Sequence, residues 1–171
     1  MTEREVDPNI TEVPEIPEVL TSLLTYVVEE AKTKFEKDGD FLPFTALAVG
    51  DTLFLESVEA GSSEQMYAFA KHTVEHVRGA SGYALCYDGY LRTNQGERDA
   101  IVAEGGVPGA LQGETVCLPY DVKDDGTREY YPQIVYMGKA PNFMGFLTDE
   151  SDPLRAAEAA DEEDGAQDAA E

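Results

Sequence analysis

The stretch that most constrains the fold of this chain is residues 81–106, which read SGYALCYDGYLRTNQGERDAIVAEGG. Residues 83–93 are rich in aromatic and other strand-favouring residues, and residues 99–103 form a second extended run. The Asn94-Gln95-Gly96 segment between them is typical of a tight turn. The stretch therefore predicts a central β-hairpin against which the remaining elements pack.

Side chains alternate across a strand, so each face of this hairpin should carry its own set of residues. On the first strand, one face is expected to hold Leu85, Tyr87 and Leu91, and the other Cys86, Asp88 and Tyr90. A turn that closes over residues 94–96 places Asp88 beside Val102 and Leu91 beside Asp99. Such carboxylates could form a catalytic acid pair, but we interpret them as surface charges on a half-solvated antiparallel sheet.

Two segments show the apolar spacing of amphipathic helices. The first begins after Pro17 and ends before Gly39, which are favourable residues at the two ends of a helix. The second opens at residues 62–65, which resemble a capping box, and ends near Gly79. We expect both helices to pack against the sheet.

Two further hairpins are predicted, one on each side of the central hairpin in the chain. Residues 41–49 and 52–58 flank Gly50-Asp51, which suits a two-residue turn. Residues 115–122 and 128–137 flank a second turn, and prolines interrupt both of these strands. The interruptions favour a bulged or edge hairpin at this end of the sheet.

These elements predict an α+β fold in the order α-β-β-α-β-β-β-β. We expect a curved antiparallel sheet of about six strands in three hairpins, with both helices on one face. Residues 18–147 should form a single domain. Residues 1–17, which contain three prolines, are expected to be a flexible N-terminal arm, and residues 148–171 an acidic disordered tail with too little apolar surface to fold.

The charge of the chain limits its partners. Its 171 residues include 12 Lys and Arg against 35 Asp and Glu, a net charge of −23. Nucleic acids are bound mainly through Lys and Arg on phosphates, and anionic membranes also attract basic surfaces, so we expect neither as a partner. The chain has no apolar run of membrane-spanning length and no secretory signal pattern, which predicts a cytoplasmic protein.

The two cysteines, Cys86 and Cys117, both lie in apolar, strand-like runs. Cysteines in this setting are usually buried thiols in proteins of reducing compartments. A reactive thiol needs an electropositive and partly exposed environment, which an acidic chain does not favour. We therefore do not predict cysteine nucleophiles.

The motif with the most specific chemistry is H-x-x-E-H, at His72 to His76 in the second predicted helix. It resembles the motif of the inverted-zincin metallopeptidases, in which the two histidines bind zinc and the glutamate activates water. In this chain those roles would fall to His72, His76 and Glu75, and the histidine spacing places both on one side of a helix. The resemblance covers five residues, and a third ligand would have to come from the acidic tail. The favoured interpretation is two histidines at the border between an apolar stripe and solvent.

Three short segments, FLPF at residues 41–44, YDG at 87–89 and GERDAI at 96–101, follow an amphipathic helix. In this arrangement the chain resembles a group of small uncharacterised bacterial proteins with no assigned activity. The resemblance would cover residues 18–140. It implies an α+β fold and supplies no catalytic residues.

Tyrosines are dense across the last two hairpins, and tyrosine is a favourable contact residue at protein interfaces. The leading hypothesis is a non-enzymatic cytoplasmic protein, without a cofactor, that binds another protein or itself through an exposed tyrosine-rich sheet edge. One alternative is a small zinc-dependent hydrolase that uses His72, His76 and Glu75. A second alternative is an acidic mimic of nucleic acid that occupies the groove of a basic partner.

Overall fold

The structure of the protein is a computed structural model, which describes residues 2–5 and 15–145. It contains two helices and a sheet of eight strands. In chain order the elements are β1 (Thr2–Glu5), α1 (Glu18–Asp38), β2 (Phe44–Val49), β3 (Thr52–Ser57), α2 (Ser63–His76), β4 (Ala80–Thr93), β5 (Gly96–Gly106), β6 (Gly113–Val122), β7 (Arg128–Tyr130) and β8 (Val135–Ala140). Neither of these helices is long and apolar enough to cross a membrane.

The main path of the sheet runs in the order β3-β2-β4-β5-β6, and all neighbours along it are antiparallel. Beyond β6, the outer edge is shared by β8 and β7, which pair with different halves of that strand. The short strand β1 pairs in parallel with the second half of β4, past the point where β2 ends. The α+β class and the predicted order of helices and strands are confirmed.

The strand count differs from the six predicted strands for two reasons. The last predicted strand, residues 128–137, is divided into β7 and β8. Residues 2–5, which belong to the segment predicted to be a flexible arm, form β1. The predicted acidic tail at residues 148–171 lies outside the described residues, so that prediction stays untested.

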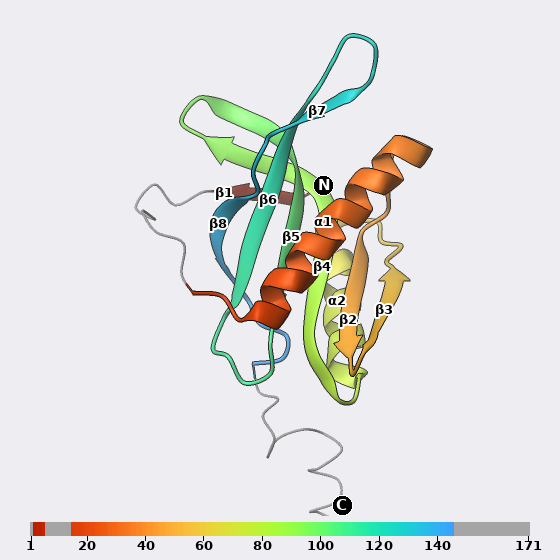
Figure 1. The fold of residues 1–171 in the computed structure, drawn as a ribbon, viewed down its shortest axis with the longest axis vertical. Helices are drawn as coiled ribbons and strands as arrows, with labels where there is room; N and C mark the ends of the chain where they lie inside the picture. The colour runs from red at the N-terminus through yellow and green to blue at the C-terminus, as the bar shows by residue number, and fades with distance from the viewer. Residues whose placement is uncertain (1, 6–14, 146–171) are drawn as a thin grey trace, which may run out of the picture.

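The two helices lie on opposite faces of the sheet, with α1 in front and α2 behind in Figure 1. The buried residues of α1 share a core with Ala84, Cys86 and Ile101, whereas those of α2 share a core with Leu85 and Tyr87. The prediction that both helices cover one face is therefore wrong. The physical reason is that β4 is buried continuously over residues 82–87, so both of its faces need apolar cover.

The turn of the central hairpin contains two residues rather than three. Thr93 pairs with Gly96, which takes part in β5 with a φ of 108°. Asp88 consequently lies opposite Ile101, and Leu91 opposite Arg98, so the predicted register is wrong by one residue. A shift of one residue reverses which face each partner side chain occupies. The faces predicted within the first strand are nevertheless correct, because Leu85, Tyr87 and Leu91 share one core and Cys86 lies in the other.

Local signals place both ends of α1 and the start of α2 as predicted, whereas α2 ends at His76, three residues before Gly79. The helix α1 begins directly after Pro17 and ends at Gly39, which has a left-handed φ of 79° and donates its N–H to the Phe35 carbonyl. At the start of α2, the Ser62 hydroxyl accepts from the Gln65 N–H, and the Gln65 side chain accepts from the Gly61 N–H. This reciprocal arrangement is a close variant of the predicted capping box.

The outer edge of β6 changes partner at Pro119. On one side of this residue Cys117 pairs with Val135 of β8, and on the other side Tyr120 pairs with Tyr130 of β7. The Pro119 carbonyl accepts a hydrogen bond from the Tyr131 N–H. A proline has no N–H to donate, so it fits the gap between two partner strands better than the middle of one.

Candidate functional site

The two histidines of the H-x-x-E-H motif lie on the solvent-exposed side of α2. His72 and His76 are both exposed, their ring centroids are 4.0 Å apart, and His76 Nδ1 lies 2.7 Å from the His72 carbonyl oxygen. The Glu75 carboxylate forms an ion pair with Lys71 at 3.4 Å. The structure thus confirms that the two histidines share one side of a helix.

A zinc site needs at least three protein ligands in most enzymes. Within residues 2–5 and 15–145, no group of three or more His, Cys, Asp and Glu side chains is placed to hold a metal ion. The two cysteines are buried thiols in different layers of the core, and burial raises the pKa of both. The arrangement of the described residues therefore gives the histidine pair no third ligand.

A buried carboxylate connects α2 to the sheet. Glu104 of β5 has only 2% of its surface exposed, and its Oε2 accepts hydrogen bonds of 2.8 Å from the hydroxyls of Tyr67 and Tyr87. The two tyrosine hydroxyls lie 3.0 Å apart. These hydrogen bonds give the buried Glu104 carboxyl oxygen two partners and join α2 to the sheet.

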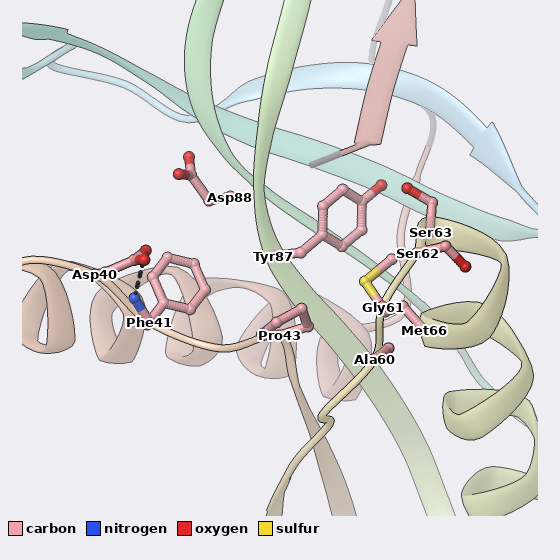
Figure 2. A pocket seen from close by; sticks show the side chains of 10 residues that line it. All are labelled: Asp40, Phe41, Pro43, Ala60, Gly61, Ser62, Ser63, Met66, Tyr87 and Asp88. Atoms are coloured by element: carbon pink, nitrogen blue, oxygen red, sulfur yellow. Dashed lines mark hydrogen bonds between the residues drawn. The ribbon is translucent and has the colours of Figure 1, made fainter.

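A cavity of about 290 Å³ opens beside this cluster, between the segment before β2 and the start of α2 (Figure 2). Asp40, Phe41 and Pro43 line one side, and the residues that begin α2 line the other. Tyr87 and Asp88 of β4 form its floor, and their side chains point in different directions because they are neighbours on a strand (Figure 2). The cavity has polar and apolar walls, and none of the described residues that line it is basic.

Asp88 is a titratable residue of this cavity with a raised pKa. Its carboxylate accepts a 2.7 Å hydrogen bond from the Tyr120 hydroxyl. Burial raises the pKa of Asp88, and the nearby carboxylates of Asp99 and Asp40 raise it further, while the hydrogen bond from Tyr120 opposes this increase. Asp88 is therefore a half-buried carboxyl group with a polar partner, whereas the sequence predicts a surface charge on a half-solvated sheet.

The seven tyrosines of the last two hairpins do not form an exposed surface. Tyr83, Tyr87 and Tyr120 are buried, and the other four are half-buried: Tyr90, Tyr130, Tyr131 and Tyr136. Several of their hydroxyls bond to carboxylates inside the fold, such as Tyr136 to Glu114 at 2.7 Å. The structure therefore does not show the predicted exposed set of tyrosines, because three of the seven side chains are buried and the other four are half-buried.

The exposed apolar edge of the sheet lies at the opposite end, on β3. All six residues of Thr52–Ser57 are exposed, and Leu53, Phe54 and Leu55 expose 42%, 54% and 44% of their surfaces. β3 is the first strand in the sheet order and pairs only with β2 among the described residues (Figure 1). Its second edge is therefore an open row of backbone donors and acceptors.

The direction of these backbone groups follows from the hairpin hydrogen bonds. The Val58 N–H donates to the Pro43 carbonyl, across the hairpin. Because the direction alternates along a strand, the backbone groups of Phe54 also face β2, and those of Leu53 and Leu55 face outward. The sequence predicts this strand but not its place at the edge of the sheet, because the run Leu53-Phe54-Leu55 would also suit a buried strand.

No family model, curated protein or solved structure matches this chain in the comparisons made with each.

Proposed function

We propose that this protein acts by binding another polypeptide as an added strand along the open edge of β3. In this proposal it carries out no reaction of its own. The observation that supports the proposal is a regular six-residue edge strand with three consecutive large apolar residues exposed. Extended segments commonly bind to such edges through main-chain hydrogen bonds, with side-chain contacts supplying specificity.

Within the part of the chain that the structure describes, β3 lacks the usual forms of edge protection, which supports this role. Edge strands are commonly protected by lysine, by proline, by a bulge or by a covering segment. Thr52–Ser57 contains neither lysine nor proline, and its six pairs with β2 run without a register shift. Its one charged residue, Glu56, accepts a hydrogen bond from Thr73 of α2 at 3.1 Å, which holds that carboxylate against its own chain. The exposed leucines and Phe54 are left as the main contact surface.

The proposal is tested with a labelled peptide that has the sequence of residues 50–59, GDTLFLESVE. Its binding to the full chain is measured by fluorescence anisotropy. We expect saturable binding that is lost when the peptide is scrambled or when its outward amides are N-methylated, because both changes remove the strand pairing.

The matched protein variants are Leu55→Pro and Leu111→Pro. Leu55→Pro removes an outward N–H from β3 and leaves the ladder with β2 in place, as prolines on sheet edges do. Leu111→Pro removes an equally apolar side chain that is 93% exposed in the loop between β5 and β6. We expect Leu55→Pro to weaken peptide binding at least about tenfold, the loss of roughly one to two hydrogen bonds. Equal binding by both variants would contradict strand addition at β3.

A further inference from the structure

We infer that the strand that occupies β3 in solution belongs to a second copy of this protein, paired antiparallel about a twofold axis. This inference rests on the proposed strand addition at β3 and names its partner. In such a pair the two sheets become one continuous sheet, and each copy contacts the other through the same residues, those of β3.

The faces of β3 determine which pairings a twofold axis allows. Leu53 and Leu55 pair with Ala48 and Ala46, which belong to the α1 core, so these leucines lie on the α1 face. Phe54 pairs with Leu47, which belongs to the α2 core. A twofold axis perpendicular to the sheet places the α1 faces of both copies on the same side of the joined sheet. Leu53 and Leu55 can therefore lie opposite a leucine of the partner but not opposite its Phe54.

One register matches the apolar residues of both copies. It places Phe54 opposite the partner's Phe54 on the axis and Leu53 opposite the partner's Leu55 on each side of it. The outward backbone groups of Leu53 and Leu55 then form hydrogen-bonded pairs, and Phe54 forms a non-hydrogen-bonded pair in which side chains are closest. Cross-strand aromatic and aliphatic pairs of this kind stabilise a sheet.

The same register also matches the polar residues. Thr52 lies opposite the partner's Glu56, so the one carboxylate of each β3 strand faces a hydroxyl group. No carboxylate faces another one. A shift by two residues in either direction places Phe54 opposite Glu56 or Thr52 of the other copy, so the Phe54 pair and the Thr52–Glu56 pairs are lost and only one leucine pair remains, on the axis. The complementarity of charge and polarity therefore selects a single register.

A neighbouring residue adds to the same surface. The hydrogen bond from Thr73 to Glu56 holds α2 beside β3, and Phe69 lies one helical turn from Thr73 with 56% of its surface exposed. Phe69 is thus on the side of the sheet that Phe54 faces. Two copies joined at β3 would bring four exposed aromatic side chains toward the junction, two from each copy.

The acidity of the chain gives this partner a characteristic salt dependence. Two copies that each carry −23 repel one another, and added salt screens this repulsion. Self-association through β3 should therefore become tighter as the salt concentration rises. Binding of a basic partner would instead weaken as the salt concentration rises, because salt also screens the attraction between opposite charges.

The first experiment is sedimentation velocity of the full chain over a range of protein concentrations, at low and high NaCl. We expect a monomer–dimer equilibrium that shifts toward dimer with salt and that Leu55→Pro abolishes, whereas Leu111→Pro leaves it unchanged. A monomer at every concentration and salt would overturn the second copy as partner. The peptide experiment would still report separately on whether β3 accepts strands.

The second experiment tests the register by disulfide formation under mild oxidation. Opposite residues in a non-hydrogen-bonded pair have Cα atoms about 4.5 Å apart, within the range that a disulfide requires. The Phe54→Cys variant should therefore form a covalent dimer, and the native Cys86 and Cys117 are too buried to compete. The control variant, Leu111→Cys, should stay monomeric in gels that are run without a reducing agent. More efficient dimer formation by Leu55→Cys alone than by Phe54→Cys would overturn the proposed register.

Discussion

At the scale of single residues, Asp88 shows how the fold controls a charge that the sequence leaves unspecified. Its carboxylate lies between the Tyr120 hydroxyl and a cavity, with Asp99 close by on the neighbouring strand. In the observed register Asp99 pairs with Tyr90, so the two carboxylates are diagonal neighbours on one face. Burial and like charge both favour the protonated form of Asp88.

This environment predicts a pH-dependent effect of Asp88→Asn. The pKa of Asp88 is raised from its ordinary value of 3.8, so the protonated carboxyl stabilises the fold below that value. The stabilisation is lost as the pH rises through the raised pKa. Asp88→Asn removes the charge, and its amide oxygen can still accept from Tyr120. We expect the variant to be more stable than the parent at neutral pH, by about 0.5 kcal/mol because the group is only half-buried.

The measurement is urea unfolding of the variant and the parent at several pH values. The difference in unfolding free energy should grow from pH 3.5 to a plateau above the raised pKa of Asp88. Asp124→Asn, in the exposed turn before β7, is the control and should show no comparable growth. A difference that is independent of pH would contradict the assigned environment of Asp88.

At the scale of elements, the close approach of β4, β5 and α1 depends on Gly105. A Cβ atom at this position would overlap the Tyr83 carbonyl oxygen and would lie 3.1 Å from Leu20 Cδ1 of α1. Gly105→Ala should therefore destabilise the fold by roughly 2–3 kcal/mol, because the strand or the helix has to move.

Gly126→Ala is the matched control for this prediction. Gly126 has a φ of 87° and no neighbouring atom within 4 Å of an added Cβ, so its substitution adds conformational strain of about 1 kcal/mol without a clash. Urea unfolding compares the two variants. If Gly105→Ala destabilises the protein no more than Gly126→Ala does, the close packing is not a stability determinant.

The elements that the sequence predicts well are those with local signals. Pro17 and Gly39 bound α1, and Gly50-Asp51 lies between two regular strands, so nearby residues suffice to place them. The register at residues 94–96 was predicted incorrectly because Gly96 can belong to a turn or, with its positive φ, to the first position of β5. Here the choice depends on the partner strand, which the local sequence does not specify.

The placement of whole elements was harder to predict. The uninterrupted apolar run of β4 was a usable sign of cover on both faces, and it points to helices on opposite sides. The β3 edge offered no such sign, because Leu53, Phe54 and Leu55 would suit a buried strand equally well. The cavity at Asp88 combines segments that are distant in sequence, and only the folded chain brings them together.

At the scale of the whole molecule, the net charge of −23 acts on the folded state as a source of self-repulsion. Screening this repulsion should stabilise the compact state. We expect the free energy of unfolding in urea to rise with NaCl at neutral pH. The measurement uses the Leu55→Pro variant, so that a change in self-association does not contribute.

The control for this prediction is the pH. The salt effect should shrink as the pH approaches 4.1, where the chain carries little net charge. A stability that does not change with NaCl at neutral pH would show that the acidic side chains are too well separated or solvated to repel one another measurably.

The proline in β6 also bears on how the chain finds its native pairing. A slip of β8 or β7 along β6 would bring a carbonyl group of the slipped strand opposite Pro119, which has no N–H to donate to it. Each misaligned arrangement thus has a missing hydrogen bond that the native arrangement avoids, because Pro119 lies at the gap between the two strands. The missing donor discriminates against wrong alignments of residues 128–140, and so favours a single folded state at this edge over several of similar energy.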